Sequence, residues 1–167
     1  MPDDFDGFLK LTDVESESKD PRHEGWIDVE SFSYSAMVNG HTIDADGKLE
    51  ANDPTPGDFT FTQGMHKASP TLFQFCVTGK QIAQAEFHAR KASGTYNFVY
   101  FKAILTDCLI TNISVNTSGK ALPVETLTIA YRKVQLIYRE QDSKRGSGTG
   151  GDVSITFDSG TNRPENV

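Results

Sequence analysis

The chain has 167 residues, of which 37% are hydrophobic and 23% charged, and its net charge is −7 at neutral pH. This length and composition predict one ordinary globular domain, residues 1–167. The negative charge argues against nucleic-acid binding, because phosphate contacts need a basic surface. No apolar run approaches the ~18 residues of a membrane-spanning helix. The start, Met1–Asp6, lacks the basic and apolar regions of a signal peptide, so we expect synthesis in the cytoplasm and export, if any, by other machinery.

The pattern in the first third of the chain predicts short strands separated by turns. Phe8–Leu11 predicts a first strand, and the polar segment Asp13–Gly25 predicts a loop. Trp26–Val38 predicts a second strand, whose apolar residues change face between Val29 and Phe32. A strand that bends or bulges there keeps both of its halves packed.

Beyond this bend, aromatic and serine residues alternate. Phe32 and Tyr34 are expected to point into a core. The residues between and beside them form a small, uncharged polar stripe outside that core: Ser31, Ser33 and Ser35.

Asn39–Asp58 is rich in turn residues and predicts an extended loop of about twenty residues, a length that usually marks a functional or disordered segment. Its polar and charged side chains are candidates for contact with another molecule: His41, Asp44, Asp46, Lys48 and Glu50. After it, Phe59–Met65 alternates apolar and small residues, as a half-buried strand does.

The strongest helix signal lies at about residues 69–79. Ser69 is expected to cap the helix, Pro70 to occupy its first turn, and Gly79 to close it in a left-handed conformation. An apolar arc covers roughly 200° of the helical wheel, and it consists of Leu72, Phe73, Phe75, Cys76 and Val77. A helix this short is unstable alone in water, so we expect it to pack against a sheet, with Gln74 and Thr78 outside the apolar arc.

The second half of the chain predicts further strands and turns. The strands are expected at Ala83–Arg90, Tyr96–Thr106, Leu109–Val115, Val124–Arg139 and Val153–Phe157, the last at a sheet edge before a polar tail. The longest changes its apolar phase between Tyr131 and Val134, which predicts a second bend or bulge. The resulting fold class is mainly β, an antiparallel two-sheet β-barrel or sandwich of about eight strands with one helix at its side.

No residue pattern indicates catalysis or a cofactor. The four histidines lack ligand spacing, and Thr42–Gly47 lacks the first ligand of a calcium loop, so no metal site is predicted. Cys76 and Cys108 are expected to be reduced core residues. The acidic residues near the start fit a solvated terminus or a face for a basic partner: Asp3, Asp4, Asp6, Asp13, Glu15, Glu17 and Asp20. A monomeric cytosolic β-barrel that binds a small ligand, or a β-barrel enzyme with a dispersed site, stays open at this point.

Several strings, in order along the chain, resemble a known family. They are Phe8–Leu11, Glu17–Asp20 with His23, Ile27–Val29, Phe32–Tyr34, Lys67–Lys80, Arg90–Gly94 with Ala85, Val124–Ile129 and Gly150–Val153. Together they look like Hcp, the haemolysin-coregulated tube protein of the type VI secretion system of Gram-negative bacteria. The similarity runs over essentially the whole chain. The departures are Phe32 and Tyr34, where many members carry tryptophan, and the acidic character of Asn39–Asp58.

The resemblance implies a structural protein rather than an enzyme, with a β-barrel assembled head to tail into a hexameric ring. Rings then stack into a tube that a contractile sheath expels behind a VgrG-type spike, so the protein is secreted without a signal peptide. The lumen carries small effector proteins, and Ser33 matches its lumen-facing serine. Ser31 and Ser35 are further candidates for the lumen, Asn39–Asp58 for ring stacking, and Gln74 and Thr78 for the subunit interface.

Overall fold

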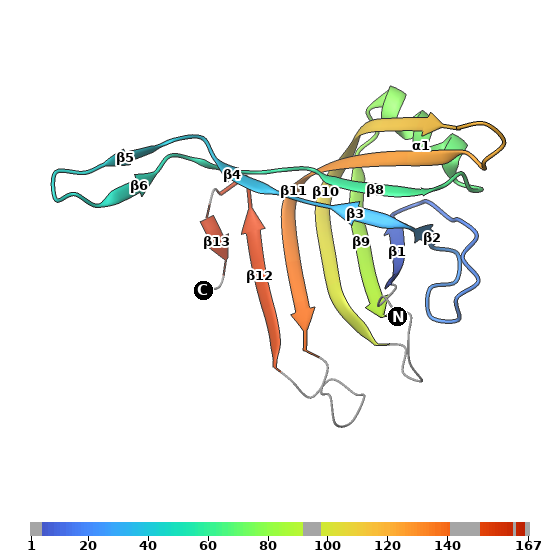
Figure 1. The fold of residues 1–167 in the computed structure, drawn as a ribbon, viewed down its shortest axis with the longest axis horizontal. Coiled ribbons are helices and arrows are strands. Elements are labelled where there is room, and N and C mark those ends of the chain that lie inside the picture. Colours follow the sequence, from blue (N-terminus) through green and yellow to red (C-terminus); the bar gives the residue numbers. More distant parts are fainter. Residues whose placement is uncertain (1–4, 92–97, 141–150, 162, 166–167) are drawn as a thin grey trace.

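The structure, a computed structural model, describes residues 5–91, 98–140, 151–161 and 163–165. In these ranges the chain forms thirteen strands and one helix (Figure 1). Nine of the strands form one antiparallel sheet, which curls into a nearly closed barrel, and the other four form two small two-stranded sheets. The prediction of a mainly β, barrel-like fold with one short helix is confirmed. The barrel is built from one curled sheet with a ribbon attached, which is why the strands outnumber the eight expected.

The spatial order of the main sheet is β13-β12-β11-β10-β9-β1-β2. The bounds of these strands are β1 Phe5–Leu11, β2 Ile27–Val29, β9 Ile82–Lys91, β10 Val99–Asn116, β11 Val124–Arg139, β12 Asp152–Asp158 and β13 Arg163–Glu165. Two shorter strands lie off this path, β3 (Ser31–Ser33) and β8 (Phe59–Gly64).

The barrel closes because the chain changes partner at Glu30. Before it, β2 pairs with β1; after it, β3 pairs with β8, which in turn pairs with β11. The Glu30 N–H donates to the Thr62 carbonyl at 2.8 Å, so the hydrogen bonding continues through the break. The bend predicted between Val29 and Phe32 is therefore confirmed, and its cause is the transfer of the chain from one side of the barrel to the other.

The second predicted bend is shared by two strands. In β10, Asp107 has a φ of 54°, and the neighbouring pairs Thr106↔Lys133 and Cys108↔Tyr131 place it opposite Arg132. The Arg132 Nε–H donates to Asp107 Oδ2 at 2.7 Å. Buried residues change from odd to even positions here in both strands, so β10 and β11 turn over together and keep their register.

Other boundaries differ from the prediction. The two strands expected within Tyr96–Val115 are one strand, β10, which carries a register shift between Ile110 and Asn112. The strand predicted to form the sheet edge, β12, is covered by β13. The sequence also predicts a turn at Lys91–Gly94 and a glycine-rich loop at Gln141–Gly151, and both lie largely outside the described residues.

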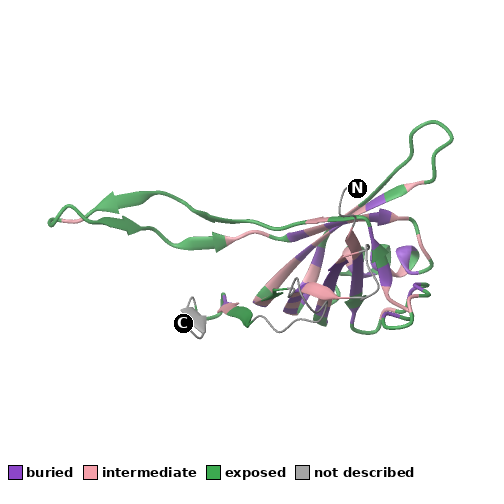
Figure 2. Cartoon of the chain, turned by 60° about the horizontal axis from the view of Figure 1, so that its bottom comes forward, coloured by how far each residue is buried: buried purple, intermediate pink, exposed green. Residues whose placement is uncertain are grey.

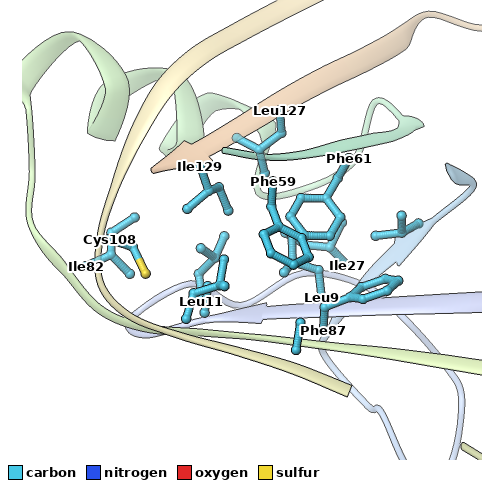
Figure 3. Packing of buried hydrophobic residues seen from close by; sticks show 14 of the residues in the cluster. Leu9, Leu11, Ile27, Phe59, Phe61, Ile82, Phe87, Cys108, Leu127 and Ile129 are labelled. Atoms are coloured by element: carbon cyan, nitrogen blue, oxygen red, sulfur yellow. The ribbon is translucent and has the colours of Figure 1, made fainter. Parts of the chain in front are cut away.

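Aliphatic and aromatic side chains fill the barrel interior (Figure 3). Phe59, Phe61 and Phe87 are at most 1% exposed, and their rings contact one another with centroids 5.2 to 5.9 Å apart. The interior is thus a packed core rather than a ligand cavity, which disfavours a small-ligand carrier. Cys76 and Cys108 are both free, as expected, and burial raises the pKa of the Cys108 thiol to about 12.

The helix, α1 (Ser69–Thr78), ends as predicted but begins differently. Gly79 adopts the left-handed conformation (φ 61°), and its N–H donates to the Cys76 carbonyl at 3.2 Å. The prediction that Ser69 is the N-cap is wrong, because Ala68 holds that position and Ser69 is already helical. The Ser69 hydroxyl instead accepts from the His66 N–H at 3.0 Å, which fixes the entry of the chain into the helix.

The barrel covers only part of the apolar arc of α1. Leu72 and Phe75 are buried and Cys76 is partly buried, but Phe73 and Val77 are 60% and 64% exposed. The expected packing against the sheet is therefore confirmed for one side of the helix. The other side leaves two large apolar side chains in solvent.

We expect Leu72→Ala to lower the free energy of unfolding by about 2–5 kcal/mol, because it opens a cavity where the helix meets the barrel. The matched control is Leu122→Ala, since Leu122 is 86% exposed, and it should stay within about 0.5 kcal/mol of the parent. Urea unfolding followed by tryptophan fluorescence measures both. Equal effects of the two substitutions would show that α1 does not contribute to the core.

Candidate functional site

The segment Asn39–Asp58 is predicted to be a loop, but most of it belongs to a two-stranded ribbon. This ribbon, residues 36–56, is called the arm. The arm projects away from the barrel (Figures 1 and 2). Its four strands are β4 Ala36–Val38, β5 His41–Ile43, β6 Leu49–Ala51 and β7 Pro54–Pro56, with β4 paired to β7 and β5 to β6. The segment is extended as expected, and backbone pairing makes it an ordered element.

Side chains of the arm fix its two turns. At the tip, Asp44 Oδ1 accepts from the backbone N–H groups of Asp46 and Lys48 at 2.9 and 2.8 Å. Between the two ribbon halves, Gly40 has a φ of 92°, and a Cβ there would lie 2.9 Å from the Asn52 amide nitrogen. The Asn52 side chain donates to the Asn39 carbonyl at 3.1 Å. These contacts explain why turn-forming residues such as Gly, Asn and Asp, which predict a loop, support a ribbon here.

The arm exposes apolar side chains that nothing in the described part of the chain covers. Ile43 and Leu49 face each other across β5 and β6 and are 68% and 64% exposed, and Met37 is 61% exposed. An isolated two-stranded ribbon is marginally stable in water. The candidate residues His41, Asp44, Asp46, Lys48 and Glu50 all lie on the arm, as predicted. Sequence reasoning missed Ile43 and Leu49, although the alternation around each of them indicates a strand.

The predicted serine stripe is exposed and extends further than predicted. Ser31 and Ser33 point outward from β3, while Phe32 between them packs on Phe87 with ring centroids 4.6 Å apart. Ser35 lies at the root of the arm, where its carbonyl accepts from the Gly57 N–H at 2.6 Å. Tyr34 is 45% exposed and stacks on Phe59, so it covers the rim of the core rather than entering it.

Residues directly opposite each other in antiparallel strands share a face. From Ser31 and Ser33 two rows therefore cross four strands, β3, β8, β11 and β10: Ser31–Thr62–Thr126–Ser114 and Ser33–Thr60–Thr128–Asn112. We call these eight residues the hydroxyl face, since seven carry hydroxyls and none is charged. Its threonines alternate with core residues in the sequence, so the signal was present, but the sequence alone did not give the strand pairing.

On α1, Gln74 and Thr78 are exposed as predicted, and the Thr78 hydroxyl donates to the Gln74 carbonyl at 2.7 Å. The stronger feature is the exposed pair Phe73 and Val77, which sequence reasoning placed in the buried arc. Phe73 lines an open groove of about 520 Å³, whose other apolar walls are Met65, Pro70, Ile113 and Val115.

A buried carboxylate, Glu125, borders the same groove. It is 0% exposed and accepts from Gln63 Nε2 at 2.9 Å and from His66 Nε2 at 3.0 Å. Burial acts to raise the pKa of Glu125, but the hydrogen bonds from His66 and Gln63 outweigh it and hold that pKa below its usual range. His66 Nδ1 accepts from the Ala68 N–H at 3.2 Å, so this cluster ties β11 to the start of α1.

Two of the acidic residues near the start are paired with Arg90. Arg90 is 7% exposed and donates to Asp6 at 2.8 Å and to Asp20 at 2.7 Å. Burial acts to raise the pKa of Asp20, but hydrogen bonds from His23 and Arg90 lower it to about 2. Asp6 and Asp20 are therefore structural, and the reading of the whole cluster as a solvated terminus is wrong for these two residues.

Neither a metal-binding cluster nor a membrane-crossing helix occurs in the parts of the chain that the structure describes. No three His, Cys, Asp or Glu side chains there are grouped so that they could hold a metal ion. No helix there has both the length and the apolar character that crossing a membrane requires.

Comparison with known proteins identifies the family. Residues 8–138 match the family described as "Type VI secretion system effector, Hcp". The chain is 32% identical over 149 residues to Protein hcp1 of Pseudomonas aeruginosa, which covers 89% of this chain and 91% of the relative.

Solved structures agree with this match. A structure described as a type six secretion system protein has a TM-score of 0.86 at 26% identity and covers 96% of this chain and 99% of its own. The crystal structure of Hcp1 from Salmonella typhimurium has a TM-score of 0.79 at 28% identity, with the same coverage. Hcp proteins are structural proteins secreted by the type VI system and are not enzymes, in agreement with the expected lack of catalytic residues. The chain belongs to the Hcp family of type VI secretion proteins.

Proposed function

We propose that this chain is the tube subunit of a type VI secretion apparatus and a carrier of small effector proteins. Six copies close head to tail into a ring, and the rings stack into a tube. The tube lies inside a contractile sheath and behind a VgrG-type spike, so the protein is made in the cytoplasm and leaves the cell through the apparatus. The observation that carries this proposal is the arm, an ordered ribbon whose apolar side chains have no cover within the described chain.

The arm is the ring-stacking element. It projects past the barrel, and the shared face of Ile43 and Leu49 gives a neighbouring ring an apolar surface to bury (Figure 2). The charged residues near its tip, Asp44, Asp46 and Lys48, add polar contacts at the rim. Burial of exposed apolar area is the main favourable term in protein association, so a stacking contact also stabilises the arm itself.

The outer side of α1 is the ring-closing element. Phe73 and Val77 stand beside Gln74 and Thr78, which gives an apolar centre with a polar rim, the usual anatomy of a protein interface. A contact between this surface and a different surface of the next subunit is heterologous, and such contacts close into rings when the rotation allows it.

The hydroxyl face is the lumen wall. A lumen that binds effectors and later releases them needs a surface with weak, unspecific hydrogen bonding and little net charge. The two rows that start at Ser31 and Ser33 offer that surface over four strands, and Ser35 continues it toward the arm.

We expect the purified protein to form rings with a mass about six times that of the 18.4 kDa chain. Val77→Asp should shift the protein to monomers, because it places a charge in the proposed apolar contact. In dilution-generated monomers, amide exchange across Pro70–Thr78 should be faster than in the ring. Multi-angle light scattering and hydrogen-exchange mass spectrometry measure these effects. A monomeric parent at concentrations well above micromolar argues against the ring, and identical exchange in both states removes α1 from the interface.

We expect Ile43→Glu and Leu49→Glu to leave rings intact and to abolish their stacking into tubes. Each places a charge on the apolar face of the arm. The matched control is Thr42→Glu, which adds the same charge to the opposite face of the same strand and should leave stacking close to that of the parent. Negative-stain images of concentrated protein count the tubes. Equal stacking by all three variants excludes this arm face as the contact.

We expect Ser33→Gln to leave the ring intact and to reduce the amount of effector protein carried per ring severalfold, since the longer amide fills space over the hydroxyl face. The control is Ser118→Gln, an exposed serine in the turn after β10. Mass spectrometry of proteins copurified with rings from the producing cells gives the load per ring. A load that is unchanged in Ser33→Gln and in Ser118→Gln alike contradicts the assignment of the lumen wall.

A further inference from the structure

Two buried histidines join the segment Thr12–Trp26 to strand β9 through a continuous chain of hydrogen-bonding groups. Asp20 Oδ1 lies 2.8 Å from His23 Nδ1, and His23 Nε2 lies 2.9 Å from His88 Nδ1. His88 Nε2 in turn lies 2.7 Å from Glu86 Oε1. His23 and His88 are 2% and 9% exposed, so water cannot replace these contacts without a structural change.

The number of protons that these three hydrogen bonds need limits the charge of the two histidines. An ionised carboxylate only accepts, so Asp20 requires a proton on His23 Nδ1, and Glu86 requires one on His88 Nε2. The contact between the two rings needs one more proton, on one of the two facing nitrogens. Three hydrogen bonds therefore need three protons on two imidazoles, which means one neutral ring and one imidazolium.

The surroundings decide which ring is neutral. His23 stacks on Phe8 with ring centroids 4.0 Å apart, and burial, with the nearby His88 and Arg90, lowers its pKa despite the hydrogen bond to Asp20. The hydrogen bond from His88 holds the pKa of Glu86 below its usual range. His23 is thus the neutral ring, and His88 donates from both nitrogens, to His23 and to Glu86.

Other charges face the pair from each neighbouring element. Asp6 and Arg90 act through Asp20, and Lys10 contacts Trp26, which lies against both rings. The side chains that line a shallow pocket of about 310 Å³ beside the two rings include three cations: Arg22, Lys102 and Arg139. Arg139 is paired with Asp152. These cations oppose a second positive charge on the pair.

We propose that His23 and His88 form an acid-sensitive latch, closed with one shared excess proton and opened by a second one. With both rings charged, two N–H groups would face each other across 2.9 Å, and the hydrogen bond between His23 and His88 would be lost. The latch lies within one chain and does not depend on the tube function proposed above.

The direction of the pH dependence follows from His23. Its pKa in the closed state lies below the ordinary 6.5, so the open state takes up a proton that the closed state excludes. Protonation of His23 therefore weakens the closed latch as the pH falls below about 6.5. Asp20, with a pKa of about 2, stays ionised throughout this window and does not contribute to the change.

The first test uses the unmodified protein. Nitrogen-15 NMR of the imidazoles at pH 7.5 should show one ring with both nitrogens protonated, His88, and one Nδ1–H ring, His23. Two neutral rings or two imidazolium rings would overturn the assignment. This measurement needs no variant and so cannot fail through misfolding.

The second test follows opening. Amide protection at Ser18, His23, Gly25 and Trp26, corrected for intrinsic exchange, should fall between pH 7.5 and 5.0, since the open state takes up a proton that the closed state excludes. Core amides of β10 and β11 should not change over the same interval.

His23→Gln keeps a side-chain donor for Asp20 and an acceptor for His88 but cannot titrate, so it should abolish the pH dependence. The control His41→Gln removes an exposed histidine on the arm and should keep the parent profile. A parent-like pH dependence in His23→Gln, or none in the parent protein, would refute the latch.

Discussion

The aromatic packing inside a small barrel is the constraint on which the rest of this structure depends. Phe59, Phe61 and Phe87, with the aliphatic residues packed around them, fill the interior, so the strands of the barrel have only one face left for function. Since side chains alternate along a strand, the outward residues of the same strands are fixed once the inward ones are. In β8 this makes the outward residues Thr60 and Thr62. A filled interior therefore produces a continuous outer face, and any binding function must lie there or on elements that leave the barrel.

The arm leaves the barrel for a related reason. Its strands continue the chain beyond β3 and before β8, past the edge of the core, so no interior remains for their apolar side chains to enter. Backbone pairing and the contacts of Asp44 and Asn52 keep the arm ordered, but they bury almost no apolar area. An ordered ribbon with uncovered Ile43 and Leu49 is an incomplete structure, and a second subunit is the simplest means of completing it.

Local patterns in the sequence were sufficient for much of this fold. Alternation located most strands of the barrel, and Pro70 and Gly79 bounded the helix, because these signals depend on neighbours a few residues away. Features that depend on distant partners were not predictable in the same way. The hydroxyl face requires knowing that Thr62 pairs with both Ser31 and Thr126. The exposure of Phe73 and Val77 required knowing how much of α1 the barrel covers. Ser69 does not cap the helix, because its hydroxyl accepts from the His66 N–H instead.

Buried polar clusters determine where the loops attach to the barrel. Glu125 and His66 hold the start of α1 against β11, and Arg90 with Asp20 holds the segment before β2 against β9. Breaking one of these hydrogen bonds would leave a buried donor or acceptor without a partner, which costs about 1–3 kcal/mol. The hydrophobic core alone would allow many positions for these segments. The surfaces that they border, the groove beside α1 and the pocket beside His88, are therefore positioned by protonation as well as by packing.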